Sequence, residues 1–154
     1  MLGVLCGAPS HGYDIAAALR PSAPLGAAWR VDRQFVYRAL ERLEGLGLVE
    51  PRRTEPSESG PPRTVFGATR RGRAELRRWL DSPVLHLRDV RSALLLKLLL
   101  LERLGLDRRP LLDAQRTAFG PLLAEHRASP GPDDVVASWR HHSAEAVAAF
   151  LDSL

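Results

Sequence analysis

Four side chains suited to binding a nucleic acid lie close together on one predicted helix: Arg33, Gln34, Tyr37 and Arg38. Helical spacing brings them to one edge of that helix, together with Glu41. Arginine pairs bidentately with guanine and glutamine with adenine, and arginine also binds phosphate oxygens. The pattern therefore predicts a face that contacts base edges or phosphates. An ordinary solvated helix face, or a core position for Tyr37, remains the alternative.

The helix that must position these side chains is predicted over residues 33–47. Asp32 can serve as its N-cap, and Gly45 and Gly47 weaken and end it. Its apolar residues fall on the opposite face: Val36, Ala39, Leu40, Leu43 and Leu46. The segment is therefore an amphipathic helix with a mostly basic polar face.

Apolar stripes and chain breakers predict the elements on either side of this helix. Residues 2–6 form the last turns of a first helix, and residues 11–20 form a second helix. The apolar stripe of the second helix consists of Tyr13, Ile15, Ala16 and Leu19. Residues 21–30 are expected to be a loop. Two extended segments, 48–53 and 63–69, are joined by a Pro-, Gly- and Ser-rich stretch and predict a β-hairpin.

The rest of the chain is predicted to be helical. A fourth helix begins at Thr69 and ends before Pro83, with Ala74, Leu76, Trp79 and Leu80 facing inward. Three more helices are expected over 89–104, 107–127 and 133–154, the second of them bent at Gly120–Pro121. We therefore expect a mainly α fold with a small β-hairpin, divided into residues 1–82 and residues 83–154.

The charge is distributed unevenly between these two parts. The chain has a net charge of +4, and residues 1–82 hold 13 arginines against 9 acidic residues, whereas residues 83–154 hold 9 basic and 9 acidic residues. Such asymmetry is expected of a polyanion-binding part joined to a neutral assembly part. Arg52, Arg53 and Arg63 flank the hairpin and would meet phosphate or the minor groove, although solvation alone explains each of them equally well.

Three helices followed by a hairpin, with the third helix basic, is the element order of a winged helix-turn-helix. Within this order, HGYDI (11–15), VYRALERLEGLGLVE (36–50) and TVFGATRRGRAELRRWL (64–80) resemble the PadR family of bacterial transcriptional regulators. The family pattern Pro-x-His-Gly-Tyr, Tyr-x-x-Leu-x-x-Leu, Gly-Leu-Val and Tyr-x-x-Thr-x-x-Gly is recognisable, with Phe66 in place of the last tyrosine. Residues 87–100 resemble the region after the wing in the subfamily with a longer C-terminal helical domain.

The resemblance implies a recognition helix in which Tyr37 contacts the DNA backbone. It also implies an aromatic or polycyclic small-molecule effector bound at a dimer interface, for which Trp29, Trp79 and Trp139 could line the pocket. Packing is the alternative role for each of the three tryptophans. Repression is the commoner habit of the family.

A dimer is also favoured by the last predicted helix. Its apolar residues follow a three-four spacing and form one stripe: Val136, Trp139, Ala146, Val147, Phe150 and Leu151, with Ser143 between them. A second copy could cover this stripe and would present two recognition helices one DNA turn, roughly 34 Å, apart. This favours an inverted-repeat operator.

Several other classes of protein lack support in the sequence. The five histidines do not fall at the spacing of a helical metal site, no catalytic motif accompanies the Ser, His and Asp residues, and we assign no metal, cofactor or enzymatic activity. The longest apolar run, Ala93–Leu101, is too short to cross a membrane and contains Lys97. The start of the sequence lacks the layout of a secretory signal, so we expect a cytoplasmic protein.

The sequence thus predicts a homodimeric, sequence-specific regulator that binds double-stranded DNA and acts as a repressor. The alternatives are a winged-helix protein-interaction module and a small-molecule carrier, neither of which binds DNA specifically.

Overall fold

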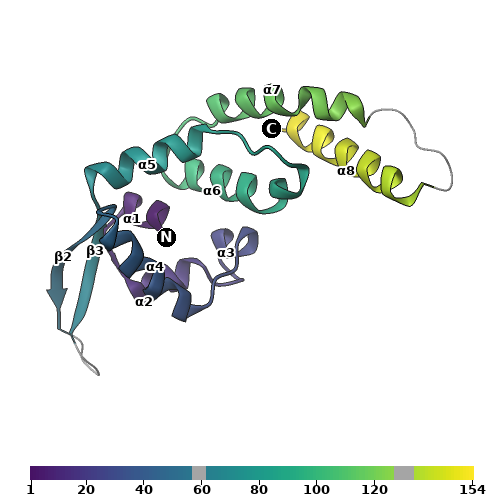
Figure 1. Cartoon of the computed structure of the whole chain (residues 1–154). Coiled ribbons are helices and arrows are strands. Elements are labelled where there is room, and N and C mark those ends of the chain that lie inside the picture. Colours follow the sequence, from purple (N-terminus) through teal and green to yellow (C-terminus); the bar gives the residue numbers. More distant parts are fainter. Residues whose placement is uncertain (57–61, 127–133) are drawn as a thin grey trace.

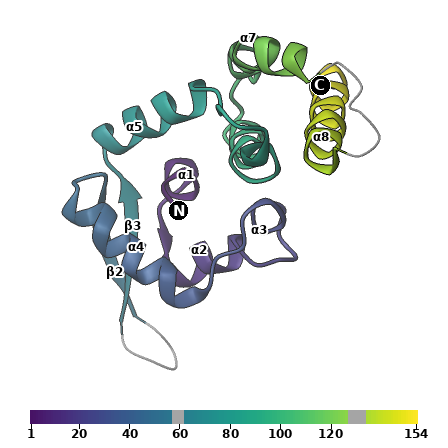
Figure 2. The same cartoon turned by 45° about the vertical axis from the view of Figure 1, so that its right-hand side comes forward.

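The computed structural model describes residues 1–56, 62–126 and 134–154. The elements, in chain order, are α1 (Leu2–Gly7), β1 (Ser10–His11), α2 (Gly12–Ala18), α3 (Pro24–Ala28), α4 (Arg33–Gly45), β2 (Val49–Glu55), β3 (Arg63–Ala68), α5 (Arg70–Asp81), the short turns η1 (Leu87–Asp89) and η2 (Val90–Leu94), α6 (Leu95–Arg103), α7 (Arg109–Glu125) and α8 (Val135–Asp152). The fold is mainly helical with one small antiparallel sheet, as predicted. The β2–β3 hairpin lies at one end of the molecule and the packed pair of α7 and α8 at the other (Figures 1 and 2).

The sheet has three strands in the order β1-β3-β2, whereas the sequence predicted only the β2–β3 hairpin. The added strand pairs Ser10 with Phe66 and His11 with Val65. Two residues are too short to show the alternation of polar and apolar side chains that identifies a strand. The outer strand β2 contains Pro51, which lacks an N–H, and the register shifts by one residue between Pro51 and Arg53.

One continuous apolar core connects the first part of the chain with the second. Leu5, Ile15 and Val36 are fully buried near the sheet, and Leu80 and Leu101 continue the same cluster toward the C-terminal helices. Besides Tyr13 of α2, which is exposed, two expected core positions were wrong. Ala74 is exposed on α5, and Leu46 is exposed because it lies past the last residue of α4, where Gly47 turns the chain with a φ of 66°.

The segment predicted as a loop between the second and third helices contains the short helix α3. Pro24 occupies its first turn, where a missing N–H is tolerated. A Cβ atom on Gly26 would lie 1.8 Å from the carbonyl oxygen of Arg20, so only glycine allows α3 to approach the end of α2 this closely. The prediction failed here because five helical residues give no readable period.

The helix predicted over 89–104 starts irregularly, as a 3₁₀ turn (η1) and a π-helical turn (η2), and becomes α-helical only at Leu95. Lys97, the cation within its apolar run, is 2% exposed. Its Nζ donates hydrogen bonds to the carbonyl oxygens of Trp79 and Ser82, at the end of α5, and lies 4.5 Å from the centre of the Trp79 ring. The lysine thus serves as a buried cap that ties α5 to α6.

The last two helices pack against each other and close the C-terminal part of the core. α7 continues through Pro121, and α8 is capped by Asp134, whose carboxylate accepts a hydrogen bond from the N–H of Ala137 at 2.8 Å. The expected helix boundaries at 127 and 133 and most of the hairpin connection lie outside the described residues. Among the helices that the structure describes, none has the length and apolarity needed to span a bilayer.

Candidate nucleic-acid interface

The helix α4 presents the polar face that the sequence predicted. All five polar residues of that face are exposed: Arg33, Gln34, Tyr37, Arg38 and Glu41. The opposite face of α4 is anchored by two buried side chains, Val36 and Leu40. Asp32 occupies the N-cap position as expected, but its side chain makes no capping hydrogen bond.

Tyr37 projects from α4 over the start of α2. Its side chain is 42% exposed, which excludes the alternative of a core aromatic. A Cβ atom added to Gly12 would lie 2.7 Å from Cε1 of Tyr37, so the ring lies directly against the glycine backbone. The His-Gly-Tyr segment therefore has a physical reason for its glycine, which is to leave room for the Tyr37 ring.

Arg33 lies between two tyrosines. Its guanidinium carbon is 5.6 Å from the centre of the Tyr13 ring and 5.9 Å from that of Tyr37. Tyr13 also receives a 3.2 Å hydrogen bond on its hydroxyl from Nη2 of Arg20. Sequence reasoning missed Tyr13 and Arg20 because it placed Tyr13 on the apolar stripe of the second helix, whereas its side chain is 45% exposed.

A second aromatic residue orients Arg38. The guanidinium carbon of Arg38 lies 4.5 Å from the centre of the exposed Phe35 ring, within the range of a cation–π contact. Phe35 was not singled out from the sequence, although helical spacing places it between Arg38 of the polar face and Leu46 of the apolar face. This contact with Phe35 restrains the Arg38 guanidinium on the exposed side of α4.

Two of the three arginines in the β2–β3 hairpin, the wing, have acidic partners. Arg52 pairs with Glu50 at 2.9 Å and lies over Gly67, and Arg53 pairs with Glu55 at 2.6 Å. The hydrogen bond from Arg53 lowers the pKa of Glu55 below its ordinary value. Arg63 is exposed at the start of β3. The charge of the wing is therefore partly neutralised, unlike that of the tyrosine-flanked face of α4.

Glu55 also connects the wing to the first strand. Its Oε2 lies 3.0 Å from Nε2 of His11, which is in β1 on the other side of β3. The hairpin is thus tied to β1 by a side-chain pair at the end of β2 next to the hairpin connection, as well as by the strand ladder.

Thr69 and Gly72 lock the wing to the helix that follows it. The Thr69 hydroxyl donates to the carbonyl oxygens of Gly47 at 2.8 Å and Leu48 at 3.2 Å, and it accepts the N–H of Gly72 at 3.0 Å as the N-cap of α5. A Cβ on Gly72 would lie 2.0 Å from the Leu48 carbonyl oxygen. The Thr-x-x-Gly motif therefore holds the end of α4, the wing and α5 in one arrangement. Arg73 donates to the Cys6 carbonyl oxygen at 2.8 Å, which gives it a structural partner.

The three tryptophans proposed for an effector pocket are not gathered in one place. Trp29 lines a cavity of about 480 Å³ with Phe35 and Val31, a cavity whose lining includes neither Trp79 nor Trp139. Trp79 is half-buried against Lys97, and Trp139 is 74% exposed on α8. Within one chain the three indoles belong to different elements and line no common cavity among the described residues.

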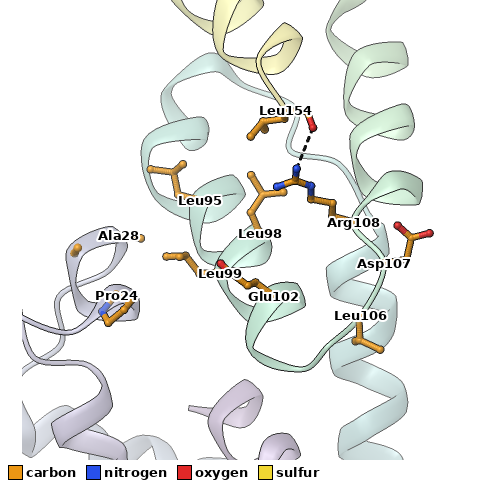
Figure 3. A pocket seen from close by; sticks show the side chains of 11 residues that line it. Pro24, Ala28, Leu95, Leu98, Leu99, Glu102, Leu106, Asp107, Arg108 and Leu154 are labelled. Carbon is orange, nitrogen blue, oxygen red and sulfur yellow. Dashed lines mark hydrogen bonds between the residues drawn. The ribbon is translucent and has the colours of Figure 1, made fainter.

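A larger apolar cavity of about 740 Å³ lies between α3 and α6 and extends to the last residue (Figure 3). Leu95, Leu98 and Leu99 supply its apolar wall, and Glu102 lies at its edge. Arg108 closes one side by donating to the carbonyl oxygen of Leu154 at 3.1 Å. Sequence reasoning missed this cavity because α3 was expected to be a loop.

The predicted dimer stripe on α8 is divided by the fold. Val147 and Leu151 are buried in the core of the single chain, which corrects their assignment to a surface that needs a second copy. Val136 and Trp139 are exposed near the start of α8, Ala146 is exposed, and Phe150 is half-buried. The stripe was read as one face because the sequence does not show that α7 covers part of it.

The helices α2 and α4 with the three-stranded sheet and its β2–β3 wing define a winged helix-turn-helix protein. The model of the transcriptional regulator PadR-like family matches residues 1–78 of the 154. The chain belongs to this family, which is a family of transcriptional regulators and not of enzymes.

The proteins similar to this chain include a curated regulator and a solved structure. The probable transcriptional regulator Rv1176c of Mycobacterium tuberculosis (strain ATCC 25618 / H37Rv) is 34% identical over 92 residues, which cover 59% of this chain and 47% of that protein. The chain thus spans about half the length of this curated relative. The crystal structure of Bacillus subtilis PadR in complex with operator DNA matches with a TM-score of 0.51 and 21% identity, over 99% of this chain and 91% of that one. That likeness confirms the expected winged fold with C-terminal helices.

Proposed function

We propose that this chain binds double-stranded operator DNA with α4 in the major groove and acts in the cytoplasm as a homodimeric transcriptional repressor. The observation that carries the proposal is the exposed face of α4, where Arg33 lies between two tyrosine rings and Arg38 lies on Phe35. These contacts limit the conformations of two arginine side chains before DNA arrives, so less side-chain entropy is lost on binding.

Each polar residue of α4 has a role in this proposal. Arg38 and Gln34 reach base edges, where arginine reads guanine and glutamine reads adenine. Tyr37 donates its hydroxyl to a backbone phosphate, and Arg33 contributes positive charge beside it. The B. subtilis PadR crystal structure contains operator DNA and shares the fold, which supports a DNA-binding role.

The wing contributes contacts to the sugar-phosphate backbone. Arg52 and Arg53 each use part of their guanidinium on a neighbouring carboxylate and retain further N–H donors for phosphate. Arg63 adds a third positive charge to the same hairpin. Because such contacts carry no sequence information directly, the wing sets affinity and orientation while α4 sets specificity.

Residues 1–82 form the DNA-binding domain in this proposal and residues 83–154 the dimerisation domain. The uncovered apolar side chains Val136 and Trp139 on α8, with Ala146 and Phe150 further along, are the surface we assign to the second copy. A two-fold dimer presents two α4 helices to half-sites roughly 34 Å apart, which requires an inverted-repeat operator.

An aromatic or polycyclic effector completes the proposal. We expect the dimer to have one conformation in which the spacing of its two recognition helices fits the operator and another in which it does not. An effector switches DNA binding only if its affinity differs between these two conformations. Of the three tryptophans, Trp29 is the nearest to α4 in the sequence, and it lines a cavity together with Phe35 of α4. We therefore assign Trp29 the main contact with such a ligand.

The test is fluorescence anisotropy with DNA from upstream of the protein's own gene and with a scrambled duplex. Arg38→Ala is expected to weaken specific binding by about 1–3 kcal/mol and to relax discrimination between the two duplexes, and Tyr37→Phe is expected to weaken binding to both. Arg109→Ala, at an exposed position on α7, is the matched control for the loss of one positive charge. Equal and weak binding of the wild-type protein to both duplexes would contradict the proposal and favour an interaction module or a carrier.

A further inference from the structure

A small cavity lies beside the recognition helix, where α2, the segment after α3 and the start of α4 meet. Its volume is about 200 Å³, and its polar lining consists of Tyr13, Arg20, Arg30, Asp32 and Arg33. A water molecule takes up about 30 Å³, so the cavity has room for a compact polar group in place of several waters. The sequence analysis assigned a role to Arg33 but none to Arg20, Arg30 or Tyr13 as ligand-binding groups.

The charge in this cavity is strongly positive. Its lining includes three arginines and a single acidic residue, Asp32. Among the described residues, none of the three arginines has a carboxylate within 4.0 Å, in contrast to Arg52 and Arg53 of the wing. Positive charge gathered without a partner is the electrostatic requirement for binding an anion.

Hydrogen bonding in the cavity leaves a donor for a ligand. Nη2 of Arg20 donates to the Tyr13 hydroxyl oxygen at 3.2 Å, so this oxygen is an acceptor in that bond and its own hydrogen is available. The guanidinium carbons of Arg20 and Arg33 lie 5.7 Å and 5.6 Å from the centre of the same tyrosine ring. Tyr13 thus contacts two arginines with its ring and adds a hydroxyl donor to their N–H donors.

The fold places these groups through a close backbone approach. Gly26 lets α3 pack against the carbonyl of Arg20, which lies two residues after α2. Arg20 lines the cavity together with Arg30, which follows α3. Arg33 begins α4 directly after the cavity, so the cavity and the exposed face of α4 share one residue.

We infer that this cavity binds one phosphate group of the DNA backbone, next to the groove that α4 enters. The inference rests on the proposed DNA-binding function and adds Arg20, Arg30 and Tyr13 to the contacts. The guanidinium groups of Arg20 and Arg30 and the Tyr13 hydroxyl donate to the phosphate oxygens, and the contact fixes the position of α4 along the duplex. The short helix α3 serves to build this phosphate site.

The experiment measures the affinity for duplex DNA across a salt series, using the whole protein and the variants Arg20→Ala and Tyr13→Phe. One phosphate contact contributes about 0.9 to the slope of log K against log salt. Arg20→Ala is expected to reduce the slope by about 0.9, whereas Arg109→Ala, which removes the same charge from an exposed site on α7, leaves it unchanged. Tyr13→Phe keeps the ring under both arginines and is expected to weaken binding severalfold at low salt.

The outcomes separate this inference from the function on which it rests. If the wild-type protein binds duplex DNA and Arg20→Ala matches Arg109→Ala in slope, the phosphate site is refuted while the proposed function stands. If the wild-type protein shows no salt-dependent DNA binding, the proposed function itself fails. A calorimetric titration of the wild-type protein and Arg20→Ala with inorganic phosphate then tests whether the cavity binds free phosphate. Phosphate binding that Arg20→Ala abolishes, with an unchanged DNA slope, would overturn the DNA assignment in favour of a free phosphate ligand. Circular dichroism and urea unfolding of each variant confirm that the fold is retained.

Discussion

Gly12→Ala is expected to impair DNA binding without unfolding the protein. The added methyl group would lie 2.7 Å from Cε1 of Tyr37, which is too close to persist, and a tight 3.2 Å from Cζ. Tyr37 is 42% exposed, so its ring can rotate away into solvent. Gly12 is the first residue of α2 and does not have a positive φ, and alanine is favoured over glycine in such a helix by roughly 0.5–1 kcal/mol. The two effects on stability oppose each other, and the net change in unfolding free energy is expected to stay within about 1 kcal/mol.

The effect on DNA affinity is larger because the displaced ring carries a proposed phosphate contact. A hydrogen bond to a charged group contributes about 1.5–3 kcal/mol. Its loss weakens binding by about tenfold to a hundredfold. The ring is also one of the two that flank Arg33, at 5.9 Å, so displacement frees that side chain as well.

The assay is fluorescence anisotropy on operator DNA with Gly45→Ala as the matched control. Gly45 is the last residue of α4, and a Cβ there would meet no atom within 4 Å, so this variant leaves DNA affinity unchanged. In a double-mutant cycle, adding Gly12→Ala to Tyr37→Phe is expected to weaken binding much less than Gly12→Ala does alone. Wild-type affinity in Gly12→Ala, or full additivity in the cycle, would refute the proposal that Gly12 acts by holding Tyr37.

Three further predictions concern the contacts that support the site. Thr69→Ala removes the N-cap of α5 and the hydrogen bonds to Gly47 and Leu48, and is expected to lower the unfolding free energy measured by urea denaturation by about 1–2 kcal/mol. Thr69→Ser keeps the hydroxyl and is expected to retain most of the wild-type stability. Lys97→Met removes the hydrogen bonds from Nζ to the carbonyl oxygens of Trp79 and Ser82, of which the Trp79 oxygen keeps a bond from the Ser82 hydroxyl. It is expected to lower the unfolding free energy by roughly 1–3 kcal/mol, seen as a lower urea midpoint without a change in slope. The hydrogen bond from Arg53 lowers the pKa of Glu55 below its ordinary value of 4.5. The contribution of the Glu55 carboxylate to stability is therefore fully present above pH 4.5 and is lost as the pH falls through the lowered pKa. Glu55→Gln is therefore expected to show a smaller loss of stability on acidification than the wild-type protein, and identical acid profiles would contradict this.

The helices of the site could be predicted because their signals are local. The polar face of α4 follows from the 3.6-residue period between Val36 and Leu40, and the cap at Thr69 and the turn at Gly47 follow from residue type. The hairpin was found for the same reason, since its two strands are bounded by turn residues.

The groups missed by sequence reasoning depend on contacts between distant elements. Tyr13 fits an apolar stripe as well as an exposed position, and only the packing of α2 against α4 decides between them. The contact between Glu55 and His11 joins β2 to β1, which only the sheet order β1-β3-β2 brings near each other. Val147 was assigned to a dimer surface because nothing in the sequence of α8 shows that its own chain covers it.

The account depends most on α4 entering the major groove, and tethered DNA cleavage tests this directly. Cys6 is the single cysteine, so Cys6→Ser allows one new thiol to be placed at will. An iron chelate attached to Glu41→Cys, on the exposed face of α4, is predicted to cut operator DNA at one short stretch in each half-site. The same chelate at Thr117→Cys on α7, at the other end of the molecule (Figure 1), is predicted to leave the DNA intact. Cutting from Thr117→Cys, or none from Glu41→Cys while the protein is bound, would contradict the account.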